Sequence, residues 1–433
     1  MTWANWAGNQ RCQPVSVEHP GTEDELAHVV KRAAAEGRTV KVVGSGHSFT
    51  DIACTSGVQV QLDRYAGLLE VDRAAGTVTV EAGARLGVLN EKLWDLGLAF
   101  PNLGDIAYQT ISGAIATSTH GTGLALGGLA SFATALRVVT GDGAVVACSA
   151  DQDPELFQAA RVGLGAIGVV SQVTLRVVPC FNLRAVEEPM RMDAVLRHVD
   201  RHAEENDHFE FYWVPHTRWA LTKRNNRTSE PVGGRGRAKE FVDRTLLENV
   251  AFGAVCRVGR WRPSLIPRLS RALPSSGRSE YVHRSYRVFT SPRLVRFYEM
   301  EYSIPRGAVV EALEKLMAFV DASGLRLSFP VEVRFTAGDD VFLSTATGGE
   351  ERAYIAVHVY QGMPYEQYFR GVEAIMDPLG GRPHWGKLHY QTAASLAPKY
   401  PDWARFQAVR RRVDPQGRFA NAYLDRVLGP VGS

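Results

Sequence analysis

Val42-Val43-Gly44-Ser45-Gly46-His47-Ser48-Phe49-Thr50-Asp51 is the segment on which the interpretation of this chain depends. It continues a β-branched run that starts at Thr39 and predicts a buried strand. Its glycines let the backbone approach a ligand closely, and successive backbone N–H groups in such a turn bind anions. The segment therefore predicts a phosphate-binding turn, with His47 placed to bond to a cofactor. The alternative from these residues alone is an ordinary tight turn with a surface histidine.

The size and composition of the chain predict a globular protein of two domains. Its 433 residues exceed the usual size of one compact core, and 45% are apolar while 22% are charged. The net charge of +3 is too small to indicate nucleic-acid binding. No apolar run approaches the roughly 18 residues that span a bilayer, and no signal peptide is apparent, so a cytoplasmic location is expected. Five cysteines, odd in number and far apart, predict reduced thiols and neither a disulfide framework nor a metal site.

Helices and short strands alternate through the first 180 residues, which indicates an α+β fold. Thr22 and Glu25 form a capping-box pattern in front of a helix that ends before Gly37. The other elements expected here are strands at 58–62, 68–71, 77–81, 136–140 and 144–148, a helix with leucines on one face at 86–96, and a short helix after Pro154.

The segment 101–123 is rich in small and hydroxylated residues and ends in His-Gly-Thr-Gly at His120–Gly123. Small side chains suit a wall where the backbone approaches a flat ring and donates hydrogen bonds to it. A flexible loop is the alternative. The interleaved isoleucines at 106, 111 and 115 argue against that alternative.

Gly163-Leu164-Gly165-Ala166-Ile167-Gly168 matches the G-x-G-x-x-G pattern of dinucleotide-binding folds. That fingerprint follows a strand and opens a helix. Here a helical pattern comes first, and the β-branched run 169–175 follows. The match is therefore interpreted as a decoy, and NAD binding is disfavoured.

The run Gly44–Ser48, continued by Asp51-Ile52-Ala53-Cys54-Thr55, resembles the flavin-attachment segment of the aldonolactone oxidoreductases, which are FAD enzymes of the vanillyl-alcohol-oxidase type. The likeness covers nearly the whole chain and is greatest to the actinobacterial L-gulono-1,4-lactone dehydrogenases. It implies FAD, carried covalently by His47. It also implies a two-domain α+β fold, with a PCMH-type FAD-binding domain at 1–178, an α+β substrate (cap) domain at 179–395, and a C-terminal segment at 396–433 that packs back on the first domain.

By the same resemblance, the residues expected to contact FAD come from several separate parts of the chain. Backbone groups of Ile167 and Val169 are expected near the flavin ring, and His384 is expected beside it. The others, in sequence order, are Val43, Gly44, Ser45, Gly46, His47, Ser48, Asp105, Thr110, Gly113, Ala116, Thr117, Thr119 and Gly121.

The run 329–335 alternates apolar and charged residues, so Glu332 and Arg334 project from the same face of a predicted strand. A solvent-facing ion pair is the alternative from sequence alone. The pair resembles the substrate-binding pair of the aldonolactone and alditol oxidases, which favours a functional role.

A second predicted strand, at 353–360, places His358 and Tyr360 on a common face. By analogy with related polyol oxidases Tyr360 contacts substrate, whereas His358 is interpreted as a hydrogen-bonded sheet histidine without a catalytic role. The turn at 381–387 resembles the family's His-Trp-x-Lys segment, in which the lysine faces the substrate. The expected catalytic residues are Glu332, Arg334 and Lys387, and the expected substrate-binding residues are these three with Asp105 and Tyr360.

The resemblance implies FAD-dependent oxidation of a sugar 1,4-lactone, of the L-gulono or D-arabinono type, at its C2 hydroxyl. Hydride transfer to flavin N5 would give an ascorbate-type product. The alternatives are an alditol or other carbohydrate oxidase, a non-catalytic flavin-binding module, and a nicotinamide-dependent reductase on the same fold. Oxygen or a cytochrome-type redox partner is the expected electron acceptor.

The segment 218–296 is dense in arginine and is interpreted as a solvated, irregular face. The alternative is a patch that docks an acidic redox partner or associates with an anionic membrane surface. Electron transfer that weakens with added salt would favour the docking patch.

Overall fold

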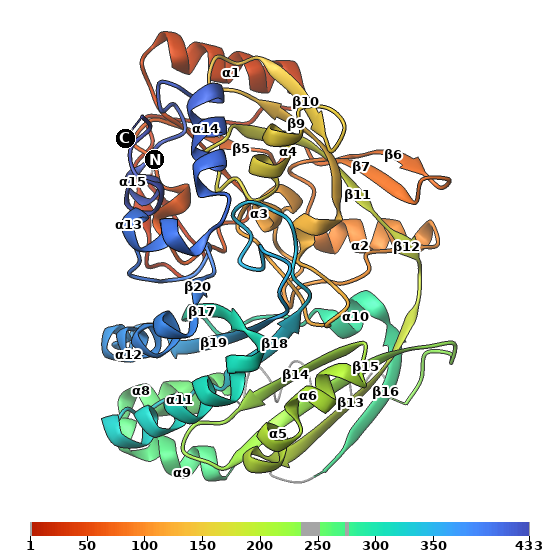
Figure 1. Cartoon of the computed structure of the whole chain (residues 1–433), viewed down its shortest axis with the longest axis vertical. Helices are drawn as coiled ribbons and strands as arrows, with labels where there is room; N and C mark the ends of the chain where they lie inside the picture. Colours follow the sequence, from red (N-terminus) through yellow and green to blue (C-terminus); the bar gives the residue numbers. More distant parts are fainter. Residues whose placement is uncertain (1, 235–251, 273–276, 433) are drawn as a thin grey trace.

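The structure is a computed structural model that describes residues 2–234, 252–272 and 277–432. Figure 1 shows an upper lobe, made by the first 180 residues and the C-terminal helices, above a lower lobe built around an eight-stranded sheet. Both ends of the chain lie in the upper lobe. The mixture of helices with parallel and antiparallel sheets confirms the predicted α+β class, and the predicted domain limits stay predictions.

Two sheets frame the upper lobe. One is parallel, in the order β3 (Ser16–Glu18), β5 (Val58–Gln61), β4 (Val40–Val43). The other is antiparallel, in the order β10 (Val145–Ser149), β9 (Ala133–Val139), β11 (Val169–Arg176), β7 (Thr77–Glu81), β6 (Leu68–Asp72). Two short pairs complete the lobe, β1 (Trp3–Ala4) with β2 (Arg11–Cys12) and β8 (Leu98–Ala99) with β12 (Val178–Pro179). The strands predicted in this region are confirmed.

The helices of the upper lobe are α1 (Glu23–Ala35), α2 (Leu86–Asp95), α3 (Ile111–Ala116) and α4 (Pro154–Arg161). At the start of α1 the Thr22 hydroxyl accepts a hydrogen bond from the Glu25 N–H at 3.2 Å, as predicted. The Glu25 carboxylate accepts from the Gly21 N–H at 2.7 Å, one residue before its expected partner. The short helix α3 was not predicted, because its Ile-Ser-Gly-Ala-Ile-Ala sequence carries no amphipathic pattern.

The lower lobe contains one sheet that is covered on one face by helices. Its strand order is β16 (Ser279–Arg284), β13 (Asn182–Arg191), β15 (Trp219–Thr228), β14 (His208–Trp213), β18 (Val331–Thr336), β19 (Arg352–Tyr360), β17 (Phe297–Pro305), β20 (Arg382–Pro383). Apolar residues on one face form a single core with α5 (Met192–Arg197), α6 (Val199–Glu204), α11 (Val309–Ser323) and α12 (Glu366–Met376). Successive strand residues point to opposite faces, so the charged residues of β18 lie on the other face, toward the upper lobe.

The arginine-rich segment is not irregular where the structure describes it. It forms β15, α8 (Phe252–Trp261), α9 (Ile266–Arg271), β16 and α10 (Ser285–Phe289), while residues 235–251 and 273–276 lie outside the described part of the chain. The helices α8 and α9 bury Cys256 and Ile266 on their apolar faces. An amphipathic pattern therefore forms regular helices here even though the segment is rich in arginine. No helix among the described residues has the length and apolar character needed to cross a bilayer.

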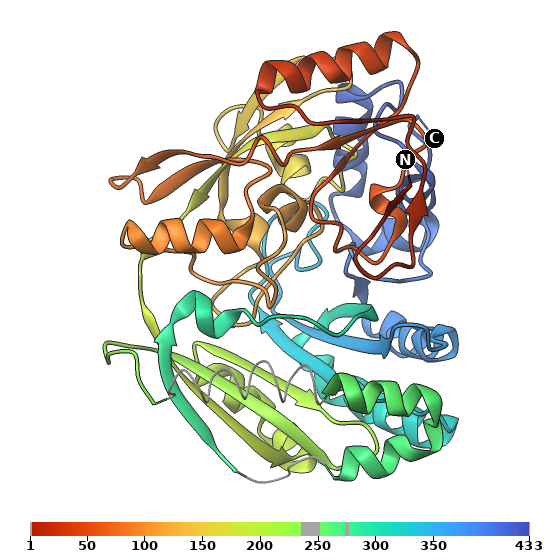
Figure 2. The ribbon, with the colours of Figure 1, turned by 180° about the vertical axis from the view of Figure 1, so that it is seen from behind.

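The C-terminal segment joins the loops that carry the predicted site. Its helices α13 (Ala393–Leu396), α14 (Trp403–Val413) and α15 (Ala422–Leu428) lie beside the N-terminal strands in both views (Figures 1 and 2). The Asn421 amide donates to the carbonyls of Asp51, Ile52 and Cys54, at 3.1, 3.1 and 2.9 Å. The Tyr423 hydroxyl donates to the Trp385 carbonyl at 2.7 Å. One segment therefore holds both the loop that follows His47 and the loop that carries Lys387.

Candidate active site

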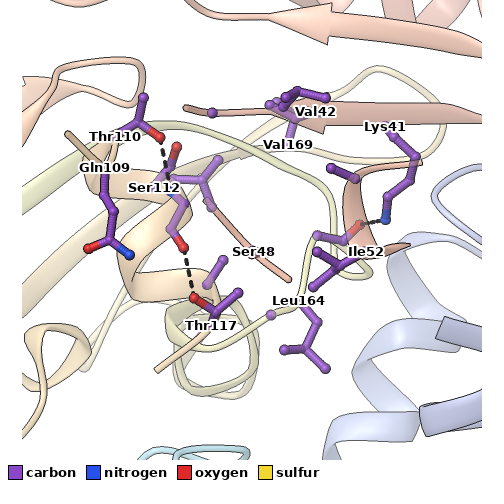
Figure 3. Close-up of a pocket in the computed structure, with 18 of the residues that line it drawn as sticks. Lys41, Val42, Ser48, Ile52, Gln109, Thr110, Ser112, Thr117, Leu164 and Val169 are labelled. Carbon is purple, nitrogen blue, oxygen red and sulfur yellow. Dashed lines mark hydrogen bonds between the residues drawn. The ribbon is translucent and has the colours of Figure 1, made fainter. Parts of the chain in front are cut away.

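A long cavity runs through the upper lobe between β4, α3 and the turn before β11 (Figure 3). Twelve of the sixteen residues predicted to contact FAD line it, namely Val43, Gly44, Ser45, Gly46, His47, Ser48, Thr110, Gly113, Ala116, Thr117, Ile167 and Val169. The structure therefore brings together three segments, of which the first and the last are more than a hundred residues apart in the sequence.

The turn after β4 has the properties of a phosphate cradle. Gly46 has φ +68°, a conformation that favours glycine. Within the described chain, no protein acceptor is seen for the backbone N–H groups of residues 45–48, although all four residues line the cavity. A methyl group on Gly44 would lie 2.4 Å from the Thr110 hydroxyl oxygen. Unused donors and a wall too narrow for a side chain fit a pyrophosphate, so the residues present suit FAD.

His47 stands between two aromatic rings at the edge of this cavity. Its imidazole stacks on Trp6, with ring centroids 5.4 Å apart, and on Tyr108 at 6.0 Å. Burial and, secondarily, the charge of Arg85 lower the pKa of His47 to about 4. The ring is therefore neutral at pH 7 and keeps a lone pair.

Lys41 also lines this cavity and was not predicted as a site residue. Its amine donates to the carbonyls of Gly165 at 3.4 Å and Phe419 at 3.1 Å; Figure 3 shows the first bond. Burial, with the nearby Arg410, lowers the pKa of Lys41 to about 7. The sequence did carry a signal for Lys41: a lysine within an otherwise apolar strand is rarely buried without a special role.

A second, charged cavity opens at the His47 end of the first and lies between the two lobes. Four residues, His47, Ser48, Gln109 and Thr117, line both cavities. The ionisable residues of the second are Asp105, His120, Arg293, Glu299, Glu301, Glu332, Arg334, His358, His384 and Lys387. A cofactor that fills the first cavity would therefore present one end to a site rich in paired charges.

Arg334 is the centre of one group of charges. Its guanidinium contacts Glu210 at 2.8 Å, Glu332 at 2.5 Å and Asp105 at 3.9 Å. The Tyr212 hydroxyl donates to Glu332 at 3.0 Å. Burial alone would lower the pKa of Arg334, but the charges of Glu332 and Glu210 outweigh burial and raise it. Burial alone would raise the pKa of Glu332, but the charge of Arg334 outweighs burial and lowers it. The pair thus stays ionised, and the predicted common face is confirmed.

Lys387 is the centre of a second group. Its ammonium contacts Glu299 at 2.5 Å and also pairs with Glu301. These two carboxylates are two residues apart on β17 and therefore lie on the same face of the strand. Burial and Lys387 lower the pKa of His384 to about 3. The Nδ1 atom of His384 accepts from the Gly386 N–H at 3.1 Å, so the proton of the neutral ring is on Nε2.

Two of the predicted site residues line neither cavity, and their predicted roles stay predictions. Gly121 lines neither cavity, because a Cβ there would face the Leu103 carbonyl at 2.3 Å instead of open space. Tyr360 also lies outside both, two residues beyond His358 on β19, with Arg260 over its ring at 5.7 Å. His358, which was given no catalytic role, lines the charged cavity. Asp105, Thr119, His384 and the three predicted catalytic residues also line this second cavity.

Glu299, Glu301, His120 and Arg293 are functional candidates that the sequence prediction missed. Glu299 and Glu301 stand two residues apart in the otherwise apolar and aromatic run Phe297–Pro305, which was a usable signal. Arg293 pairs with Asp105 across the lobes, a contact between residues almost two hundred positions apart, for which the sequence has no local signal.

Known proteins resemble the chain over its whole length. Residues 173–427 match the family model for D-arabinono-1,4-lactone oxidase, and residues 14–149 match the model for an FAD binding domain. The L-gulono-1,4-lactone dehydrogenase of Mycobacterium tuberculosis is 47% identical over 99% of both chains. The L-gulonolactone oxidase of Bos taurus is 35% identical over 99% of this chain and 98% of its own.

A solved structure of cholesterol oxidase from Brevibacterium sterolicum has the same fold. It aligns with a TM-score of 0.81 at 18% identity, covering 99% of this chain and 96% of that chain. The likeness confirms the predicted fold class and, at this identity, concerns the fold alone.

Proposed function

Because the chain belongs to the D-arabinono-1,4-lactone oxidase family of FAD-linked lactone oxidases and dehydrogenases, we propose that it oxidises the C2 hydroxyl of a sugar 1,4-lactone of the L-gulono or D-arabinono type. The product would be a keto-lactone that tautomerises to an ascorbate-type enediol. The observation that carries the proposal is the meeting of the two cavities at His47, Ser48, Gln109 and Thr117.

The residues of the charged cavity can bind and activate such a substrate. Oxidation of a secondary alcohol removes a proton from oxygen and a hydride from carbon, and FAD, when bound, supplies the hydride acceptor. Lys387 and Arg334 would stabilise the negative charge that develops on the substrate oxygen. Glu332, whose pKa is lowered by Arg334 despite its burial, is a weak base. It is therefore assigned to holding substrate hydroxyls and orienting Arg334.

Anaerobic mixing with substrate tests this proposal. We expect L-gulono-1,4-lactone or D-arabinono-1,4-lactone to bleach the visible absorption of the bound flavin, and alditols and NADPH to leave it unchanged. Reoxidation by oxygen or by cytochrome c then identifies the electron acceptor. Bleaching by an alditol without bleaching by either lactone would replace the proposal with a polyol oxidase, and rapid bleaching by NADPH would replace it with a reductase.

We also propose that FAD is attached covalently to His47. The support is a neutral, half-buried imidazole in the turn after β4, at the edge of the first cavity. We expect wild-type protein denatured in acid to keep its yellow colour and His47→Ala to release it. The pKa of His47 is lowered to about 4, so the attacking neutral form persists above that pH and the yield of attachment should be equal at pH 8 and pH 6. A yield that falls by about half near pH 6.5 would indicate an ordinary histidine.

A further inference from the structure

Five ionisable side chains form a continuous, largely buried chain at the wall of the charged cavity, in the order His120, Glu301, Lys387, Glu299, His358. They come from four parts of the fold: the loop after α3, strand β17, the 384–387 turn and strand β19. Lys387 is at the centre, and each of its two carboxylates has a histidine on its other side.

The hydrogen bonds of His120 determine its protonation. Its Nδ1 lies 2.9 Å from the Gly121 carbonyl oxygen, which can only accept, so Nδ1 carries a proton. Its Nε2 lies 2.5 Å from a carboxylate oxygen of Glu301. Two lone pairs at that distance would repel each other, so a second proton lies between them. His120 and Glu301 together therefore hold a proton that a neutral histidine beside a carboxylate would lack.

His358 is placed in a similar way at the other end, at longer distances. Its Nδ1 is 3.2 Å from the Pro330 carbonyl oxygen, and its Nε2 is 3.3 Å from Glu299. The surroundings supply no other proton acceptor at hydrogen-bond distance for either histidine among the described residues. Tyr354 stacks on His120 at 3.6 Å, His384 lies 6.0 Å from it, and Phe297 and Phe329 enclose His358.

The extra protons change the charge that faces the substrate. With both histidines protonated, three cations oppose two carboxylates and the chain is positive; with both neutral, one cation opposes two carboxylates and it is negative. An alkoxide forming beside Lys387 is stabilised only in the first case. The nearby charges outside the chain, Glu332, Arg334 and Arg293, are themselves paired with one another or with Asp105.

We propose that His120 and His358 are positioning residues that, as protonated partners of Glu301 and Glu299, hold Lys387 in place and keep its surroundings positive for substrate oxidation. This inference rests on the proposed lactone oxidation. Neither histidine needs to touch the reacting atoms, because each acts through a carboxylate that Lys387 shares.

The decisive variant is His120→Gln, which can still donate a hydrogen bond to Glu301 but cannot carry charge. We expect it to bind FAD, to keep the lactone dissociation constant within about twofold, and to lower the limiting rate of flavin reduction about tenfold. A lower limiting rate with an unchanged lactone dissociation constant is the result that a merely structural role of His120 would not produce.

The matched control is His19→Gln. His19 also contacts a carboxylate, Asp63, at 2.7 Å, but this pair is on the surface of the upper lobe. We expect the limiting rate and the lactone dissociation constant of His19→Gln to equal those of wild type. An unchanged limiting rate in His120→Gln, with lactone still bleaching the wild-type flavin, would overturn the inference and leave the proposed function intact.

A measurement without turnover covers the remaining outcomes. In wild-type protein labelled with ¹⁵N-histidine, we expect both ring nitrogens of His120 and of His358 to be protonated at pH 7. If His120→Gln fails to bind FAD, or if no lactone bleaches the flavin, this spectrum of the wild-type protein tests the inference by itself. A lone pair on Nε2 of His120 would overturn the inference, whereas failure of lactone bleaching with both nitrogens protonated would reject the proposed function alone.

Discussion

Arg334→Lys is expected to lower the limiting rate of flavin reduction by lactone by roughly 10²- to 10³-fold, the loss typical of removing one preorganised donor to a developing oxyanion. The guanidinium reaches Glu210 and Glu332 at once, at 2.8 and 2.5 Å. A lysine ammonium is a point charge and cannot bridge two carboxylates with the fixed fork of an arginine. The substitution keeps the charge and loses the geometry. Stopped-flow absorbance under anaerobic conditions measures the effect.

Arg306→Lys is the matched control for this experiment. Arg306 also bridges three carboxylates, those of Asp200, Glu204 and Glu351, but it does so on the surface of the lower lobe, away from the charged cavity. We expect it to reduce flavin at the wild-type rate. Equal losses in the two variants would mean that Arg334 acts through the stability of the lobe, and thermal unfolding of both proteins would show this directly.

Local sequence patterns were sufficient wherever a functional residue depends on its own strand or turn. The period of two in β18 placed Glu332 and Arg334 on one face, and the glycines after β4 predicted the tight turn that lines the first cavity. The decoy at 163–168 was also recognised locally, because α4 precedes it and β11 follows it. In these places one element contains all the information that the prediction needed.

Contacts between distant segments were beyond the reach of local patterns. Lys387 was predicted, but its partners Glu299 and Glu301 depend on β17 lying beside the 384–387 turn, where the Glu299 carbonyl accepts from the Leu388 N–H. Tyr360 shows the same limit of local patterns. The strand period placed it on the face of His358, and its strand partner Phe297 lines the charged cavity, but Tyr360 itself does not, so its contact with substrate stays a prediction.

Gly44→Val is expected to raise the dissociation constant for FAD roughly 10- to 100-fold, because overpacking a tight contact costs about 1–3 kcal/mol and each 1.4 kcal/mol is a factor of ten in binding. Even the first carbon of the new side chain would lie 2.4 Å from the Thr110 hydroxyl oxygen. That hydroxyl caps α3 by accepting from the Gly113 N–H, and both glycines line the cofactor cavity. The valine would therefore displace the cap and fill the cradle together.

The experiment is sharpest in a His47→Ala background, where covalent attachment cannot trap weakly bound cofactor, with flavin fluorescence recorded as FAD is added to apoprotein. Gly307→Val is the control, because Gly307 is exposed and a Cβ there meets no atom within 4 Å. If Gly44→Val binds FAD as tightly as this control, the turn after β4 is not where the pyrophosphate lies. The unused N–H groups of residues 45–48 would then need another partner. If Gly307→Val binds FAD with normal affinity and Gly44→Val binds it more weakly, these donors and the narrow wall beside them hold the cofactor.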